Sequence, residues 1–502
     1  MRLEYDNKHP AKIRGRKHAM KICCYAHASS AVFFRALVKH CNVSGDDIEW
    51  SVITPQAPFY DHFDDLIPAE RRLYLYRDFD RRYREMQPPF EWIDNPRFDS
   101  IYLTLARDKN GYRKIDKDEQ LRRAAVVTAI YREFLKRIRP DYLLLPDVEA
   151  VNGYILSNLC VELGIPMLNY IDMRILGRAF FGLDFHDNLP PYFGSHSEAD
   201  RAIAKDVIAD FRAGKPRAAF AKFPPSRPSK PSLLRRIFRN SWLRWRYERL
   251  HESEETLGMR IRINVFPAVA IIRRRRFDAR HAQFFDIVTP DEPLPPRYIL
   301  YMLQKSPESS INGFEPYFVD QMRVIDLLLY NMPADYKLVV KEHPASIGIR
   351  SRDFYRSLRR KPGAVMAHPD VPSPRLIDGA SLVVSVTGTV GLECYLLGKP
   401  AMLIGSVFFK HLCHHLGSFD GLGDQLRAII ANPQVATEDE REIEIAKLLN
   451  IGAEFVISDP WFVPGVCAPD NIAAAREHMW ESINRRGDSS VPRTLDRARH
   501  SG

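Results

Sequence analysis

The sequence predicts an α/β protein made of doubly wound, Rossmann-like units with parallel strands. Two stretches support this prediction. Residues 382–405 run through a buried apolar strand, a loop of small hydroxylic and glycine residues, a short helix and a second apolar strand, as one half of a parallel sheet does. Residues 20–39 begin the same way, with the strand MKICCY, a small-residue loop and a helix. A chain of 502 residues is long enough for two or three such domains.

Composition and strand spacing divide the chain into six parts. We predict a basic mobile arm (1–17), an N-terminal Rossmann-like domain (18–213), a proline-rich linker with a basic amphipathic insert (214–284), a C-terminal Rossmann-like domain (285–468), a helix (469–486) and a disordered polar tail (487–502). In such folds the terminal helix often crosses back to the first domain.

The overall composition is that of a globular protein, with 45% hydrophobic and 27% charged residues. No apolar run approaches the roughly 20 residues that a membrane span needs, and the N-terminus lacks an apolar signal-peptide core. We therefore expect the chain in the cytoplasm. The seven cysteines have no metal-ligand spacing, so we expect reduced, mostly buried thiols and no metal site.

The net charge of +10 is concentrated in the insert, where residues 221–280 hold 16 Lys or Arg against 5 Asp or Glu. Residues 233–250 combine apolar side chains at helical spacing with flanking arginines. Such a helix can lie in a membrane interface and bind anionic head groups. The alternative is an interdomain helix whose arginines are solvated, and no nucleic-acid motif accompanies the charge. The candidate membrane residues are Arg235, Arg236, Arg239, Trp242, Trp245 and Arg246.

Two carboxylates follow a predicted strand of the N-terminal domain. Asp147 and Glu149 come directly after the apolar stretch 141–146, at the strand end where open α/β sheets bind their ligands. Either could act as a general base. The alternative is that Asp147 only caps the next helix. His27, after the first strand, is a weaker third candidate.

Polar loops also follow successive strands of the C-terminal domain. Gln304 and Glu308 follow the strand 297–303, and His343 follows the strand 337–341. Pro344 restrains the backbone at His343, so the imidazole is held at the edge of the sheet. There it could donate to a phosphate whose charge the neighbouring Lys341 neutralises.

The third loop follows the strand 382–385. Its hydroxyl side chains and the free N–H groups of the next helix suit a phosphate or a nucleotide pyrophosphate. Glu393, one turn into that helix, could accept hydrogen bonds from ribose hydroxyls. The alternative is that the glycines only permit a tight turn and that Thr389 is only a helix cap. The loop residues concerned are Ser385, Thr387, Gly388 and Thr389.

The motif Lys341-Glu342-His343-Pro344, with residues 385–393, Gly398-Lys399-Pro400 and the preceding Gln304 and Glu308, resembles the capsule polysaccharide biosynthesis family. The resemblance is specific over about 297–405 and architectural over 18–175. It implies a GT-B glycosyltransferase with two facing Rossmann-like domains, the donor nucleotide in the C-terminal one and the acceptor in the N-terminal one, and metal-independent chemistry. Members of the family transfer Kdo from CMP-Kdo during capsule assembly.

Carried over to this chain, the resemblance implies that His343 contacts the donor phosphate. Ser385, Thr387 and Thr389 would hold the phosphate and the sugar, and Glu393 would hold the ribose. Gln304 and Glu308 correspond to the family's Gln and Pro-Glu positions. The base stays open between Asp147, Glu149 and His27.

The resemblance also implies partners and a location. We expect a nucleotide-activated sugar as substrate, a lipid-linked or glycan acceptor, no separate cofactor, and peripheral attachment to the anionic inner leaflet of the membrane. Two alternatives stay open. A nucleotide-sugar 2-epimerase shares the two-domain architecture but needs no acceptor and no membrane helix. A non-catalytic capsule-assembly scaffold would keep the fold and bind only lipid or partner proteins.

Overall fold

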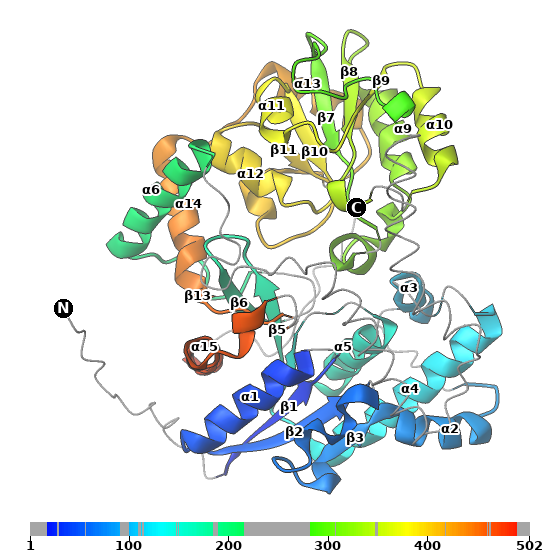
Figure 1. Ribbon diagram of the computed structural model, residues 1–502, viewed down its shortest axis with the longest axis vertical. Helices are drawn as coiled ribbons and strands as arrows, with labels where there is room; N and C mark the ends of the chain where they lie inside the picture. The colour runs from blue at the N-terminus through cyan, green and yellow to red at the C-terminus, as the bar shows by residue number, and fades with distance from the viewer. Residues whose placement is uncertain are drawn as a thin grey trace, which may run out of the picture.

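The computed structural model describes residues 18–27, 30–55, 57–90, 100–108, 112, 115–146, 148, 150–183, 189–214, 282–306, 308–346, 350–416, 418–458, 460 and 463–488. Two α/β domains lie one above the other in this part of the chain (Figure 1). The predictions about the basic arm, the amphipathic insert with its six membrane residues, and the polar tail concern residues outside these ranges. So do Asp147 and Glu149.

The N-terminal domain is built on a seven-stranded sheet with the order β13-β6-β5-β4-β1-β2-β3. Its strands are β1 (Met20–Tyr25), β2 (Ile48–Thr54), β3 (Arg72–Tyr74), β4 (Tyr142–Leu145), β5 (Met167–Asp172), β6 (Arg178–Gly182) and β13 (Ala453–Glu454). β1 to β5 run parallel, and β6 and β13 are antiparallel additions. The central position of β1 between β2 and β4 makes the sheet doubly wound.

Helices cover both faces of this sheet. They are α1 (Ser30–Val43), α2 (Leu75–Glu85), α3 (Ile101–Ala106), α4 (Lys117–Ile138) and α5 (Val151–Leu163). The longest of them, α4, begins after the N-cap Asp116 and ends before Pro140. Each face has its own apolar cluster, which gives the domain two core layers around one sheet.

The C-terminal domain has a six-stranded sheet with the order β12-β11-β10-β7-β8-β9, in which all pairs are parallel. The strands are β7 (Tyr298–Met302), β8 (Lys337–Lys341), β9 (Ala364–Ala367), β10 (Leu382–Ser385), β11 (Ala401–Leu403) and β12 (His414–His415). The helices are α9 (Gln321–Asn331), α10 (Arg352–Arg359), α11 (Ser373–Asp378), α12 (Val390–Leu397) and α13 (Leu422–Ala431). This is the Rossmann strand order, with its switch point between β7 and β10. The predicted two-domain Rossmann-like class is confirmed.

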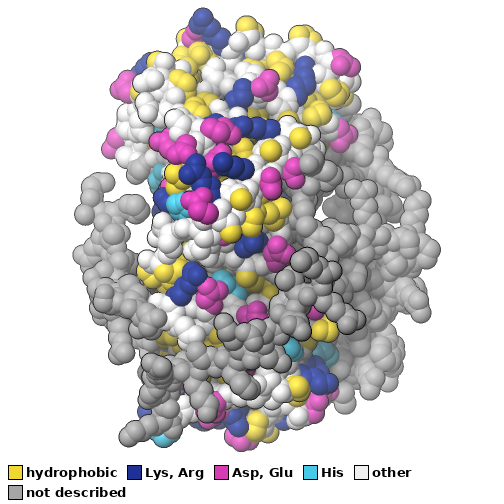
Figure 2. All heavy atoms as spheres, turned by 90° about the vertical axis from the view of Figure 1, so that its left-hand side faces the viewer, with side chains coloured by type: hydrophobic (Ala, Val, Ile, Leu, Met, Phe, Trp, Pro, Cys, Tyr) yellow, Lys and Arg dark blue, Asp and Glu magenta, His cyan; other side chains and the backbone are white. Residues whose placement is uncertain are grey.

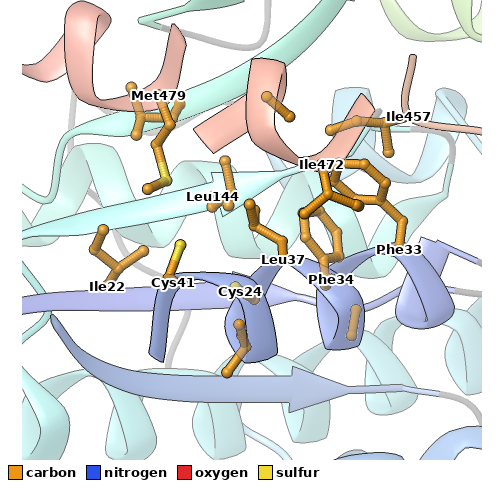
Figure 3. Packing of buried hydrophobic residues seen from close by; sticks show 14 of the residues in the cluster. Ile22, Cys24, Phe33, Phe34, Leu37, Cys41, Leu144, Ile457, Ile472 and Met479 are labelled. Atoms are coloured by element: carbon orange, nitrogen blue, oxygen red, sulfur yellow. The ribbon is translucent and has the colours of Figure 1, made fainter. Parts of the chain in front are cut away.

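The chain returns to the N-terminal domain after α14 (Glu438–Ile451). β13 pairs with β6, and α15 (Pro469–Asp488) lies on α1. Figure 3 shows Ile457 and Ile472 on the side of Phe34, and Met479 on the side of Cys41, in one buried cluster. The crossing back of the terminal helix is therefore observed. The predicted domain boundary at residue 468 lies too late, because the apolar segment after β13 is already buried in the N-terminal core.

A shared apolar cluster joins the two domains on the side of α6 (Glu198–Arg212). Ile208 of α6 and Phe180 of β6 pack in it with Leu392 of α12. Ion pairs border the cluster: Arg212 contacts Glu438 of α14 at 2.7 Å. Figure 2 shows this face, where Lys and Arg side chains alternate with Asp and Glu. No helix within the described ranges is long and apolar enough to cross a bilayer.

Candidate functional site

The loops that follow β7, β8 and β10 meet at one edge of the C-terminal sheet, since these three strands are neighbours. The amide nitrogen or oxygen of Gln304, after β7, lies 3.3 Å from Ser385 Oγ at the end of β10. The charge of Glu308, further along the first loop, acts on His343 after β8. The structure thus brings together residues that the sequence analysis selected from three separate stretches.

The side chain of Gln304 fills the loop after β10. With its oxygen facing the backbone, the amide accepts hydrogen bonds from Thr387 N and, at 2.7 Å, from Gly388 N, while its nitrogen donates to Thr387 Oγ1 at 3.1 Å. Ser385 Oγ also accepts from Gly388 N at 3.1 Å. Gln304, Ser385 and Thr387 are all buried. Their contacts hold the loop from its buried side, whereas Thr389 is partly exposed.

The backbone of Gln304 is held by a residue that sequence reasoning missed. Gln304 N donates to Gln321 Oε1 at 2.7 Å, and Gln321 Nε2 donates to Gln304 O at 2.9 Å. Gln321 is the first residue of α9 and is buried. This paired arrangement satisfies two buried backbone groups and fixes the start of the loop.

A buried charge pair connects the loops after β7 and β8. Arg350 donates to Gln304 O, and its Nε lies 3.0 Å from Glu342 Oε2. The Glu342 carboxylate also accepts from His343 N at 2.6 Å and from the Tyr355 hydroxyl at 2.7 Å. Burial and the Glu342 carboxylate raise the pKa of Tyr355, so its phenol stays a donor. Nothing in the local sequence marked Arg350 or Tyr355, because their partners are brought near only by the fold.

The imidazole of His343 is half-buried at the sheet edge. Burial lowers its pKa from 6.5, and the negative charges of Glu308 and Glu342 oppose that shift. The ring is therefore neutral near pH 7, with one nitrogen able to donate and the other able to accept. An anion bound beside it would favour the protonated form.

The ammonium of Lys341 is buried and donates to Pro369 O at 2.9 Å. Burial lowers its pKa, while the charges of Asp370, Glu342 and Glu393 oppose the shift. Lys341 thus connects β8 to the loop after β9. Its direct contact with a donor phosphate stays a prediction. The carboxylate of Asp370, which is exposed, also interacts electrostatically with Lys341. Sequence reasoning did not select Asp370.

Thr389 and Glu393 lie at the start of α12. Thr389 occupies the N-cap position, but its side chain makes no capping hydrogen bond. Its Oγ1 lies 3.5 Å from Glu393 Oε1, and both residues are partly exposed. The capping role that was the simpler alternative for Thr389 is therefore not observed.

The N-terminal domain meets this region through α3 and α5, which lie on its side toward the C-terminal domain (Figure 1). Tyr154 of α5 contacts Gly313 of the π-helical turn η5 (Ser309–Gly313), which follows the β7 loop. The positive charge of Arg107, after α3, acts on Glu315. Burial raises the pKa of Glu315, whose carboxylate accepts from Ser406 N at 2.9 Å. None of these residues was selected from the sequence.

His27 follows β1 as predicted and is partly exposed. Its ring stacks on that of Tyr25 with centroids 5.7 Å apart, and its carbonyl accepts from Ser30 N at 3.2 Å. Within the described ranges no group of His, Cys, Asp or Glu side chains is arranged to hold a metal ion.

Residues 259–458 match the family model described as "Capsule polysaccharide biosynthesis protein". This segment, about two fifths of the chain, is therefore similar to the capsule polysaccharide biosynthesis family. The match includes the three loops from Gln304 to Glu393 and thus the whole C-terminal part of the site. His27, Arg107 and Tyr154 lie outside the capsule-family segment.

One curated relative is the capsule polysaccharide export protein KpsS of Escherichia coli, 28% identical over 124 residues, or 23% of this chain. The match spans about a third of that relative's length (32%). Among solved structures, KpsC beta Kdo 2,4 transferase of Thermosulfurimonas dismutans is 11% identical, with a TM-score of 0.36 over 68% of this chain and 87% of that one. UDP-GlcNAc 2-epimerase of Methanocaldococcus jannaschii is 12% identical, with a TM-score of 0.24 over 86% and 99%. At these TM-scores neither likeness carries a functional argument.

Proposed function

We propose that the protein is a GT-B-type glycosyltransferase of capsule or surface polysaccharide biosynthesis. It would move a sugar from a nucleotide donor to a lipid-linked or glycan acceptor. The observation that supports this most is that Gln304, His343 and the 385–389 loop lie together at the switch point of a Rossmann sheet. The segment that contains this sheet matches the capsule-family model. Open α/β sheets bind nucleotides at such points.

In this proposal the donor phosphate lies between His343 and the start of α12. His343 donates a hydrogen bond to the phosphate, and Thr389 with the positive end of the α12 dipole favours the charge. Glu393 accepts from the ribose hydroxyls. The contacts among Gln304, Ser385 and Thr387 would hold the loop in position from its buried side. We propose a CMP-activated acidic sugar, such as Kdo, as the donor.

The reaction itself would need positioning and charge stabilisation and no metal or cofactor. The acceptor hydroxyl attacks the anomeric carbon while the bond from that carbon to the phosphate oxygen breaks. The negative charge that develops on the departing nucleotide is stabilised by His343 and the helix dipole. The proton of the acceptor hydroxyl passes to a base on the N-terminal side, for which Asp147, Glu149 and His27 are the candidates.

We further propose that the protein works in the cytoplasm at the inner leaflet. A lipid-linked acceptor presents its sugar at the membrane surface, and residues 233–250 combine apolar side chains with arginines at helical spacing. Such a helix would give reversible attachment to anionic lipid.

The experiment that tests the proposed function is a thermal-shift screen of wild type and His343→Ala against CMP, UDP, GDP and CDP, followed by product analysis. A ligand present at about 100 times its Kd stabilises the folded state by roughly 2.7 kcal/mol. We expect CMP to stabilise wild type and to stabilise the variant less. Transfer from CMP-Kdo to an acceptor glycolipid is the expected reaction.

Three results would contradict this proposal in different ways. A preference for UDP would overturn the choice of donor. Conversion of a UDP-sugar into its epimer without any acceptor would indicate a nucleotide-sugar 2-epimerase. Binding to lipid with no response to any nucleotide would indicate a non-catalytic scaffold.

A further inference from the structure

A single tyrosine of the N-terminal domain closely contacts the loop region of the C-terminal domain. Tyr154 is fully buried, and its hydroxyl faces Gly313 at the end of η5. An ideal Cβ built on Gly313 would lie 1.9 Å from Tyr154 Oη and 3.1 Å from its Cζ. No side chain fits at residue 313 while the phenol keeps its position. We refer to this as the Tyr154–Gly313 contact.

Two contacts within the N-terminal domain hold Tyr154 in place, one at its hydroxyl and one at its ring. Its hydroxyl donates to Val148 O at 2.9 Å, in the loop that follows β4. The Arg107 guanidinium lies 5.2 Å from the centre of its ring. Gly153 allows Val148 to approach α5, since a Cβ there would lie 3.2 Å from Val148 Cγ1. The phenol is therefore fixed to the carboxyl edge of the N-terminal sheet.

On the C-terminal side, η5 is attached to the candidate donor site. Thr387 Oγ1 donates to Ser310 O at 2.7 Å, which joins η5 to the loop after β10. Glu308 N donates to Asn312 Oδ1 at 3.1 Å, and Glu308 is the residue whose charge acts on His343. A displacement of η5 would consequently move groups beside both the 385–389 loop and His343. Single π-helical turns occur frequently at functional sites.

We propose that Tyr154 is a positioning residue whose contact with Gly313 sets the distance between the acceptor-side loop after β4 and the donor-side loop after β10. This inference rests on the proposed glycosyltransferase function, because only a reaction between substrates held on two domains depends on that distance. A displacement of about 1 Å between reacting groups can cost on the order of 100-fold in rate. Tyr154 itself does not touch the reacting atoms in this scheme.

The test is a double-mutant cycle with Gly313→Ala and Tyr154→Phe. The methyl group of Gly313→Ala meets the hydroxyl oxygen and must push η5 and α5 apart. We expect kcat of sugar transfer to fall at least about tenfold, while the nucleotide still stabilises the folded variant. Tyr154→Phe removes the obstructing oxygen and leaves Cζ as the nearest atom, at 3.1 Å. The double variant should therefore recover kcat to the level of Tyr154→Phe alone.

A matched tyrosine and glycine pair lies inside the C-terminal domain, at the opposite edge of its sheet. Tyr298 at the start of β7 donates to Leu376 O at 2.7 Å, and a Cβ on Gly379 would lie 2.7 Å from Tyr298 Oη. Gly379→Ala places a methyl group against the Tyr298 hydroxyl, and Tyr298→Phe removes that hydroxyl. Both residues belong to the C-terminal domain, so this pair does not affect the contact between the two domains. We expect this control cycle to change the thermal midpoint but to leave kcat within about twofold of wild type.

The outcomes separate the inference from the proposed function. Loss of kcat in Gly313→Ala, with recovery in the double variant, supports the positioning role. If folded Gly313→Ala transfers sugar as fast as wild type, or if Tyr154→Phe fails to restore it, the inference is wrong while the glycosyltransferase stands. If wild type transfers no sugar and responds to no nucleotide, both proposals fall together. If kcat falls equally in the control cycle, the loss in Gly313→Ala is explained by general destabilisation of the fold. That result would also overturn the inference.

Discussion

The side-chain amide of Gln304 lies against the backbone of Gly388, with its oxygen 2.7 Å from Gly388 N. A glutamine from the β7 loop thus occupies N–H groups of the loop after β10, at the switch point of the C-terminal sheet. Because an amide oxygen is a neutral acceptor, it can hold this loop in a binding-ready form without the charge that would repel a phosphate.

Gln304→Ala should destabilise the C-terminal domain. The substitution removes the acceptor of the buried Thr387 N and one of the two acceptors of Gly388 N, which costs about 1–3 kcal/mol. Urea unfolding measures the loss. The control is Gln425→Ala on α13, whose amide makes only exposed contacts of 3.2–3.3 Å and whose removal should cost no more than about 0.5 kcal/mol. Equal losses in the two variants would show that Gln304 does not hold the loop.

His343→Ala should abolish most sugar transfer while leaving the fold intact. The side chain is half-buried at the sheet edge, and in the proposed reaction it stabilises the charge that develops on the leaving nucleotide. The initial rate of transfer and the thermal midpoint are the two measurements. His368→Ala, in the neighbouring His-Pro dipeptide after β9, is the matched control and should retain more activity. Near-normal turnover of His343→Ala would remove this residue from the mechanism.

Nucleotide binding should tighten as the pH falls. Burial places the pKa of His343 below 6.5 in the free protein, and a neighbouring phosphate should raise it. Binding then takes up a proton, so the affinity increases from the pKa of the complex down to that of the free protein. The check is the Kd of the preferred nucleotide between about pH 8 and about pH 6. A slope that persists unchanged in His343→Ala would assign the proton to another group.

Arg350→Met should be among the most destabilising single substitutions at this edge. Arg350 and Glu342 form an ion pair whose side chains are only 10% and 0% exposed. Removing one partner leaves a buried uncompensated charge, which costs about 3–5 kcal/mol. The exposed pair of Arg297 and Asp335, at 63% and 55% exposure, provides the control: Arg297→Met should cost at most about 1 kcal/mol. Chemical denaturation of both variants measures the free energy of unfolding. A similarly small loss of stability in the two variants would contradict the prediction.

Replacing the arginines of the insert should weaken binding to anionic vesicles. Each basic side chain near an anionic surface contributes about 1 kcal/mol, or roughly a fivefold change in affinity. The variant changes Arg235, Arg236, Arg239 and Arg246 to Gln, and co-sedimentation compares phosphatidylglycerol with phosphatidylcholine vesicles. The control removes the same charge from the C-terminal domain at the exposed Arg297, Arg323, Arg356 and Arg427. Equal binding by both variants would argue against membrane attachment through the insert.

The sequence by itself determined the fold class and the position of the polar loops that follow the strands of the C-terminal sheet. Apolar runs such as the one ending at Ser385, each followed by polar residues, are local patterns, and parallel strands place their carboxyl ends at the same edge. His343 and Gln304 could therefore be selected before their neighbours were known. The likeness of residues 259–458 to the capsule family lies in the same stretch.

Only the tertiary structure decided how these residues are held and what faces them. The hydrogen bonds of Gln321 and Arg350 to Gln304, and the Tyr154–Gly313 contact, join residues that are distant in the chain. No periodicity encodes such pairs, because they depend on crossover connections and on how two domains pack. The return of residues after 453 to the first domain has the same origin, since an apolar segment can be buried in either core. Local patterns predict elements, whereas contacts between distant side chains are properties of the assembled fold.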